Sequence, residues 1–177
     1  LISKDGWFRE AEAMWPGQRF SLKVKEVVHT EHSGLQDVII FDSESYGRVL
    51  VLDGVIQLTE RDEASYQESL THIPLFAHPN PKSVLIVGGG DGGVLREVAR
   101  HTTVETIVMC DIDKRVVDLA KEYFGSSTAT AFGDPRLTLL HQDAALYVKD
   151  HPEQFDVIIV DSTDPVGPAE SLFTRQF

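Results

Sequence analysis

Cysteine, basic residues and long apolar runs are all scarce in this chain of 177 residues. The single cysteine, Cys110, excludes an internal disulfide and a thiolate metal cluster, so we expect a reducing, cytoplasmic setting. No apolar run approaches the roughly 18 residues that a membrane helix needs, and no secretion leader is recognisable, so we expect a soluble protein without a membrane partner. Only 16 Lys and Arg stand against 28 Asp and Glu, a net charge of −12, which disfavours a nucleic-acid partner because phosphates need a basic face.

The remaining composition is that of a globular protein, because 42% of the residues are hydrophobic, 25% charged and 8% aromatic. The sequence begins at Leu1 and stops within SLFTRQF, a stretch typical of the first turns of a helix. We therefore expect the chain to lack a C-terminal part.

The N-terminal segment, residues 1–60, has the pattern of β-strands. Apolar and polar residues alternate along it, and an Asp53-Gly54 pair separates two of the alternating runs. Such a pair is the strongest short-range signal for a tight hairpin. The segment therefore predicts a small antiparallel β domain.

A connecting helix and an α/β domain are expected to follow. Thr59 with Asp62 three residues later is a helix-start signal, and Pro74, Pro79 and Pro81 are expected to end that helix within the connecting segment 61–81. Over residues 82–177, short Val/Ile/Leu runs alternate with helical segments. This alternation predicts a Rossmann-like, methyltransferase-type doubly wound sheet, incomplete at its C-terminus, whose ligands bind at the carboxyl ends of the strands.

A glycine-rich loop lies between the strand-like run VLIV and the helical segment VLREVAR. Its glycines permit a tight turn and a close approach of the backbone to a ligand, while the following helix offers free amides. This placement predicts a nucleotide or nucleoside site rather than a packing turn alone. The glycines are Gly88, Gly89, Gly90, Gly92 and Gly93.

Asp111 ends the next strand-like run, 18 residues after Gly93 (111 − 93). A carboxylate at this position can accept hydrogen bonds from both ribose hydroxyls, in dinucleotide and nucleoside sites alike. Asp113 directly precedes the following helix and is the better candidate for its N-cap.

The negative charge of this sheet edge favours one ligand class over the other. Asp91 lies inside the glycine loop, where it would repel the phosphates of a dinucleotide. Asp143, Asp161 and Asp164 follow later strands and add charge of the same sign. The ligands should therefore be cations, such as a sulfonium nucleoside and an amine. A metal on Asp91, Asp161 and Asp164 is the less favoured alternative, and we predict no metal site.

The motif DSTDPVGPAE follows the last apolar run and begins with two carboxylates three residues apart, Asp161 and Asp164. One of them can take a proton from an amine while the other holds a second positive charge. In the alternative interpretation, Asp164 is only a turn residue ahead of Pro165.

These motifs together resemble one family, the spermidine synthase type of polyamine aminopropyltransferase. The resemblance covers most of the chain, and GGGDGGVLRE and DSTDPVGPAE are its most specific stretches. Further matching stretches are GWFRE, MWPGQ, LQDVIIF, VLVLDGVIQLTERDEASYQE, CDID and HQDA. The resemblance implies transfer of an aminopropyl group from decarboxylated S-adenosylmethionine, as cosubstrate, to putrescine, giving spermidine and 5′-methylthioadenosine. It implies no permanently bound cofactor.

The resemblance also implies roles for individual residues. The positions that match binding sites for the decarboxylated cosubstrate are Gln36, Gln67, Asp91, Asp111, Asp143 and Ala144. Tyr66 and Asp164 match putrescine-binding positions, and Asp161 matches the proton acceptor beside putrescine. Asp111 departs from the family, which usually has glutamate there, so we expect weaker binding of the nucleoside.

Other functions fit parts of the same pattern. Putrescine N-methyltransferases resemble the same family and keep a similar glycine loop, and spermine synthase differs in acceptor length, which depends partly on residues outside this chain. A catalytically silent member that only binds nucleosides is a third alternative, but it would not need Tyr66, Asp161 and Asp164. Because family members generally form dimers or tetramers, we expect a homodimer or homotetramer.

We predict that the 177 residues expressed alone are unstable or inactive. The reason is that an open edge of the parallel sheet and one helix face would be uncovered. The check is an assay of this segment with putrescine and the decarboxylated cosubstrate, and robust turnover would contradict the prediction.

Overall fold

The structure, a computed structural model, describes residues 1–11, 16–152, 154–164, 167–175 and 177. Two predicted motifs lie partly outside the described residues, MWPGQ at Met14 and Trp15 and DSTDPVGPAE at Pro165 and Val166. The chain divides into two compact units, Leu1–Ala64 and Ser65–Phe177.

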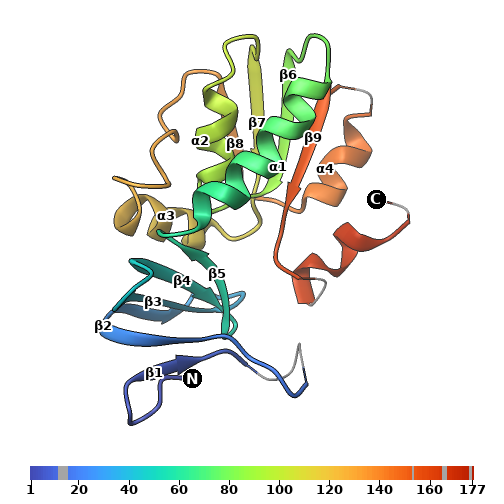
Figure 1. The fold of residues 1–177 in the computed structure, drawn as a ribbon. Coiled ribbons are helices and arrows are strands. Elements are labelled where there is room, and N and C mark those ends of the chain that lie inside the picture. The colour runs from blue at the N-terminus through green and yellow to red at the C-terminus, as the bar shows by residue number, and fades with distance from the viewer. Residues whose placement is uncertain (12–15, 153, 165–166, 176) are drawn as a thin grey trace. The chain divides into compact units, whose positions relative to one another are not determined.

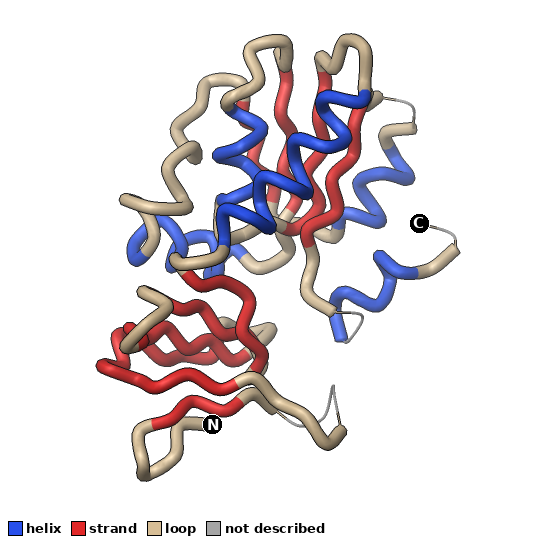
Figure 2. Tube along the Cα trace, in the orientation of Figure 1, coloured by secondary structure: helices blue, strands red, loops and turns tan. Residues whose placement is uncertain are grey.

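The first unit contains a five-stranded antiparallel sheet in the order β1-β2-β3-β4-β5, visible in Figures 1 and 2. The strands are β1 (Trp7–Arg9), β2 (Ser21–His32), β3 (Asp37–Ser43), β4 (Arg48–Leu52) and β5 (Val55–Thr59). The predicted hairpin is confirmed: Leu52 pairs with Val55, and Asp53 and Gly54 both have positive φ, 47° and 82°. Two left-handed residues in a two-residue loop match the twist of the strands they join.

The second unit contains a four-stranded parallel sheet in the order β8-β7-β6-β9. Its strands are β6 (Ser83–Gly88), β7 (Thr106–Cys110), β8 (Leu137–Leu140) and β9 (Val157–Asp161). Its helices are α1 (Glu63–Ala77), α2 (Gly93–Ala99), α3 (Lys114–Tyr123), α4 (Ala144–Asp150) and the 3₁₀ helix η1 (Gly167–Phe173). The predicted fold class is thereby confirmed, an antiparallel β domain followed by a parallel sheet with helices.

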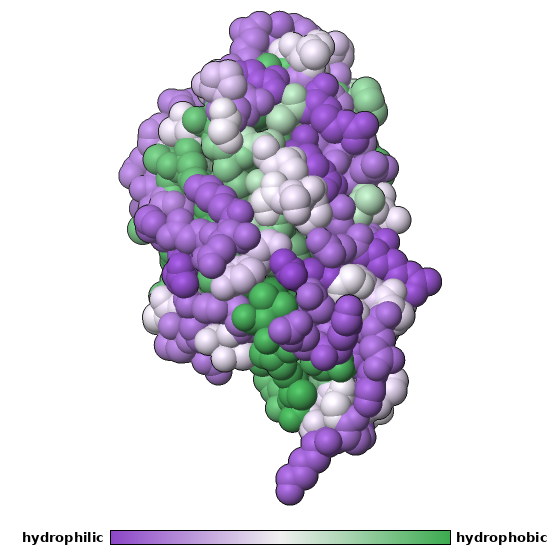
Figure 3. Space-filling view, turned by 90° about the vertical axis from the view of Figure 1, so that its left-hand side faces the viewer, coloured by the Kyte–Doolittle hydropathy of each residue, from purple (hydrophilic) through white to green (hydrophobic). Residues whose placement is uncertain are grey.

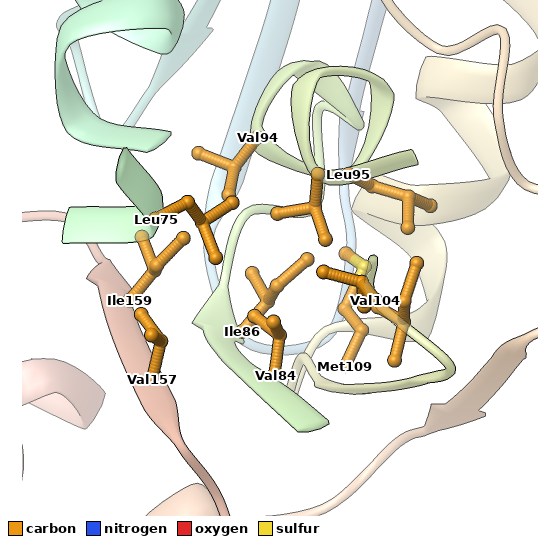
Figure 4. Close-up of a cluster of buried hydrophobic side chains, with 11 residues drawn as sticks. Leu75, Val84, Ile86, Val94, Leu95, Val104, Met109, Val157 and Ile159 are labelled. Atoms are coloured by element: carbon orange, nitrogen blue, oxygen red, sulfur yellow. The ribbon is translucent and has the colours of Figure 1, made fainter. Parts of the chain in front are cut away.

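Hydrophobic clusters cover both faces of the parallel sheet. Figure 4 shows Leu75 of α1 and Val94 and Leu95 of α2 packed towards Ile86 of β6 and Met109 of β7. The cluster on the other face joins buried residues of β6 and β7 to α4 and η1; it includes Leu85, Val87, Val108, Cys110, Ala144 and Leu172. Strands buried on both faces read as continuous apolar runs, which is why the sequence predicted this sheet.

The start and end of α1 differ from the prediction. Thr59 is the last residue of β5, and its hydroxyl donates to Asp62, so this pair forms a turn and the helix begins at Glu63. The helix ends at Ala77, ahead of the predicted Pro79 and Pro81, but Pro74 lies inside it instead of ending it. A proline lacks only its own N–H donor, and the helix continues for one turn, closed by the bond from the His78 N–H to the Pro74 carbonyl.

Parallel pairing brings the carboxyl ends of the four strands to one edge. Gly88 at the end of β6 is in register with Asp161 at the end of β9, and β7 and β8 run beside them in the same direction. Strand β6 lies between β7 and β9, which makes it the point where the strand order reverses. Ligands of open parallel sheets bind beyond such a switch point.

The face shown in Figure 3 is mainly hydrophilic, with smaller hydrophobic areas. Exposed apolar residues include Ile73 and Phe76 of α1, which are 69% and 77% accessible. Among the helices of the described ranges, not one combines the length and the apolar character that crossing a membrane requires.

Shortening the Ile86 side chain on β6 tests how much this core contributes to stability. Ile86 is completely buried in the cluster beneath α1 and α2, so Ile86→Ala should lower the free energy of unfolding by about 3 kcal/mol through lost burial and an unfilled cavity. Ile73→Ala on the exposed face of α1 is the matched control and should change it by less than about 0.5 kcal/mol. Urea unfolding of the full-length variants checks this, and equal effects would contradict it.

Candidate active site

The glycine loop crosses the end of β9 at very short range. The Gly89 N–H donates to the Asp161 carbonyl at 2.7 Å, and a Cβ added to Gly88 would lie 2.1 Å from the same oxygen. Gly88 also has a φ of 77°, in the left-handed region that favours glycine. The loop therefore needs glycine at this position to bring its backbone against the strand that carries Asp161.

Asp91 and Gln67 meet over the first turn of α2. The Asp91 carboxylate accepts the Gly93 N–H at 2.7 Å and the Gln67 side-chain amide at 3.2 Å to each oxygen. A Cβ at Gly93 would lie 2.3 Å from Cδ of Gln67, so glycine makes the space that the glutamine occupies. Gln67 is 1% exposed, and its Oε1 has no hydrogen-bond partner among the described residues. A buried oxygen without a donor is costly, so a ligand that reached it would gain by donating a hydrogen bond.

Asp161 and Tyr66 form the second contact between α1 and the sheet edge. The Tyr66 hydroxyl donates to Oδ1 of Asp161 at 2.9 Å. Oδ2 of Asp161 is buried and lacks a hydrogen-bond partner within the described part of the chain. A buried acceptor without a donor is costly unless a proton or a ligand supplies one, so Oδ2 is suited to receive a proton from a bound amine.

Burial and neighbouring charge set the ionisation of this pair. Burial raises the pKa of Asp161 to about 7, with the charges of Asp91 and Asp111 adding to the effect and the Tyr66 hydrogen bond opposing it. The pKa of Tyr66 is also raised above its usual value, first by burial and then by the Asp161 charge. Tyr66 therefore remains a neutral hydrogen-bond donor, while Asp161 can gain or lose a proton near neutral pH.

Asp111 lies against the opposite side of the glycine loop. Its carboxylate is 9% exposed, accepts the Asp113 N–H at 2.8 Å, and would come within 2.6 Å of a Cβ at Gly90. Burial raises the pKa of Asp111 to about 6, against the lowering effect of the Asp113 amide. Asp113 caps α3 by accepting the Arg115 and Val116 N–H groups, which confirms its predicted structural role.

Asp143, Ala144 and Asp164 follow other strands of the same sheet. Asp143 is the N-cap of α4 and accepts the Ala145 N–H at 2.8 Å, a structural contact that the sequence analysis did not assign. Ala144 is buried at the start of α4. Asp164 lies three residues beyond the end of β9 and is partly exposed, and its charge contributes to the raised pKa of Tyr66.

Gln36 belongs to the first unit, in the turn between β2 and β3, where its backbone carbonyl accepts the Ser33 N–H. Its suggested role stays a prediction.

The sequence did not indicate two residues that pack against the glycine loop. Ala129 and Phe132 lie against Gly92, where a Cβ would meet the Phe132 ring at 2.7 Å. They lie in a stretch of small polar residues with no periodicity, so the sequence holds no local signal for this contact.

The described residues hold no group of three or more His, Cys, Asp or Glu side chains arranged to bind a metal ion. They do place Tyr66, Gln67, Asp91, Asp111 and Asp161 in one unit around the end of β6. Besides burial, the charge of Asp91 raises the pKa of both Asp111 and Asp161, so these carboxylates form a site of strong negative potential, which favours cationic ligands.

The raised pKa of Asp161 predicts a pH-dependent stability difference. Because its folded pKa of about 7 exceeds the unfolded value of about 4, wild type loses stability relative to Asp161→Asn as pH rises through that window. The difference in unfolding free energy should shift in favour of the variant by on the order of 2 kcal/mol between about pH 4.5 and about pH 8.

Asp118→Asn is the control, because a hydrogen bond from Lys114 lowers the pKa of Asp118. This variant should show no such gain. Denaturant unfolding of both variants across pH tests the prediction, and a pH-independent difference for Asp161→Asn would contradict it.

Comparison with known proteins identifies two family models in the chain. A spermine/spermidine synthase domain matches residues 63–177, and a spermidine synthase tetramerisation domain matches residues 6–60. Spermidine synthase 1 of Pisum sativum is 57% identical over 173 residues, and spermidine synthase of Schizosaccharomyces pombe is 53% identical over 176 residues. These alignments cover 97% and 99% of this chain but only 52% and 59% of the two relatives, so the chain spans little more than half their length.

Two solved structures share the fold. A spermidine synthase in complex with the transition-state analogue AdoDATO has a TM-score of 0.92 and 40% identity over 99% of this chain and 60% of that one. Spermidine synthase from Thermotoga maritima has a TM-score of 0.85 and 39% identity over 92% and 56% of the two chains. On the match of both domain models and this identity to its relatives, the chain belongs to the spermine/spermidine synthase family.

Proposed function

We propose that the protein containing this chain is a spermidine synthase, which transfers an aminopropyl group from decarboxylated S-adenosylmethionine to putrescine. Family membership and the relatives named spermidine synthase support the reaction, and a related structure binds a transition-state analogue. The observation in this chain that carries the proposal is the Asp161 carboxylate, which has one oxygen held by Tyr66 and a second, buried oxygen without a partner among the described residues. That arrangement suits a base acting on an amine.

On the acceptor side, putrescine arrives with both amines protonated. Oδ2 of Asp161 takes a proton from the attacking ammonium, and Tyr66 holds the other oxygen in place. Asp164, partly exposed beyond β9, pairs with the distal ammonium. The freed nitrogen then forms a bond to the aminopropyl carbon next to sulfur, while the C–S bond breaks and its electron pair neutralises the sulfonium as 5′-methylthioadenosine. Positioning supplies much of the rate, because the protein forms no covalent intermediate.

On the donor side, the acidic edge binds the cationic cosubstrate. Asp111 accepts hydrogen bonds from the ribose hydroxyls, while Asp91 and the free Oε1 of Gln67 hold the aminopropyl ammonium. Asp143 and Ala144 bind the nucleoside beyond the end of β8, and we assign Gln36 to the same cosubstrate by its family position. Asp91 also discriminates by charge, because it repels the carboxylate that S-adenosylmethionine retains and the decarboxylated form lacks.

The wider properties follow from the same assignment. The reaction needs no permanently bound cofactor, since both substrates bring the groups that react. We place the protein in the cytoplasm as a homodimer or homotetramer, and the match of residues 6–60 to a tetramerisation domain supports self-association. Methyl transfer to putrescine and synthesis of spermine are less favoured, because the relatives described above are named spermidine synthases.

The role of Asp161 predicts a pH profile. In the full-length enzyme, kcat/KM for putrescine should rise with pH through an apparent pKa near 7, because the base must be ionised to accept the proton. Asp161→Asn should lower kcat by at least about 10²-fold and abolish this rise of kcat/KM with pH. Asp118 is a surface carboxylate paired with Lys114. The control variant Asp118→Asn should leave both kcat and the pH profile unchanged. Spermidine formation, measured by chromatography, checks the prediction, and near-normal turnover by Asp161→Asn would contradict it.

A further inference from the structure

Helix α1 supplies two residues of the site, and it contacts the hydrophobic cluster beneath it through Leu75 and the partly buried Leu70. Its buried residues, Gln67, Thr71 and Leu75, are spaced by four and form one stripe along the helix. Two of these three are polar, and only Leu75 is among the buried members of the hydrophobic cluster beneath α1 and α2. The position of α1 therefore depends heavily on its polar contacts.

A second polar contact lies further along α1, beyond Tyr66 and Gln67. Nε2 of His72 lies 3.1 Å from Oε2 of Glu97 on α2, and Nδ1 of His72 lies 2.8 Å from Nε2 of His101. Glu97 is 2% exposed, so it is a buried carboxylate between the two helices that Figure 1 shows on the same side of the parallel sheet. Removing a partner of a buried charge costs free energy, so the His72–Glu97 contact should contribute to holding α1 against α2.

Glu97 is held as an anion. Burial alone would raise its pKa, but hydrogen bonds from Arg96 at 2.8 Å and Arg100 at 2.6 Å outweigh burial and leave the pKa below its usual value. An ionised carboxylate only accepts hydrogen bonds, so Nε2 of His72 must carry the proton it donates. Nδ1 of His72 shares a second hydrogen bond with Nε2 of His101. Both ring nitrogens of His72 are thus used, one in a contact with Glu97 of α2 and one in a contact with His101, just beyond the end of α2.

This contact lies close to the site residues along the helix. His72 follows Gln67 by five residues, which corresponds to about 7.5 Å along an α-helix. At the other end of that segment, Tyr66 contacts Asp161 and Gln67 contacts Asp91. Cationic substrates would bind these same two carboxylates, whereas Glu97 is already bonded to His72, Arg96 and Arg100.

We propose that His72 and Glu97 are positioning residues, which hold α1 in place so that Tyr66 and Gln67 meet the substrates. The inference rests on the proposed function, because it assigns to α1 the task of presenting these two side chains. The His72–Glu97 contact would continue to hold α1 when substrates bind to Asp91 and Asp161.

The test compares His72→Leu with His72→Gln in the full-length enzyme. Leucine removes both hydrogen bonds, so the KM values for putrescine and for the decarboxylated cosubstrate should rise about tenfold, while kcat changes by less than about threefold. Glutamine can donate to Glu97 and accept from His101, so it should restore both KM values to within about threefold of wild type. His78→Leu is the matched control, because the His78 side chain accepts the Asn80 N–H just beyond α1, away from the site, so this variant should leave KM unchanged.

Unchanged KM values in His72→Leu would overturn the proposal even if its melting temperature fell, and so would a glutamine variant as impaired as the leucine variant. If His72→Leu does not fold, Glu97→Gln takes its place, with a several-fold rise in both KM values expected and unchanged values contradicting the proposal.

Hydrogen–deuterium exchange separates this inference from the proposed function. If the wild-type enzyme makes no spermidine, the proposed function fails. Exchange in peptides from α1 would still report whether the His72–Glu97 contact holds the helix in place. We expect at least tenfold faster exchange around Tyr66 and Gln67 in His72→Leu but not in His78→Leu. Equal exchange in the two variants would contradict a positioning role for His72.

Discussion

The arrangement of the second unit depends on the concentration of buried negative charge at the carboxyl edge of its parallel sheet. Asp161 carries this constraint most clearly, since burial and the charges of Asp91 and Asp111 raise its pKa to about 7. Placing carboxylates so close together costs free energy that a bound cation offsets. A site of this kind selects its ligands by charge before any shape is considered, and both proposed substrates are cations.

Close backbone contact makes that concentration possible. The loop after β6 presses on Asp161 through Gly88, and the missing side chain at Gly93 leaves room for Gln67 beside Asp91. Any larger residue at these two positions would push the carboxylates apart. The site therefore unites groups from distant parts of the chain: Tyr66 and Asp161, which share a hydrogen bond, are 95 residues apart. Two cations held in this geometry need only lose one proton to react.

Local patterns in the sequence sufficed for the elements and for part of the site. The Asp53-Gly54 hairpin and the Asp113 cap were predicted because each depends on a few neighbouring residues. Of the three prolines expected to end α1, Pro79 and Pro81 do follow it, but Pro74 lies inside it, where packing through Leu75 tolerates one missing backbone hydrogen bond. The contacts of Gln67 and the burial of Asp161 could not be predicted, since they depend on how distant segments pack. Resemblance to a family named these residues, but it did not reveal which oxygens lack partners.

The most direct test of the account is a competition experiment with the full-length protein. The protein is incubated with putrescine and an equal mixture of S-adenosylmethionine and its decarboxylated form, and the products are identified by mass spectrometry. The account predicts spermidine and 5′-methylthioadenosine, because Asp91 rejects the carboxylate of S-adenosylmethionine. N-methylputrescine with S-adenosylhomocysteine would contradict it, since the acidic edge would then not select the decarboxylated cosubstrate.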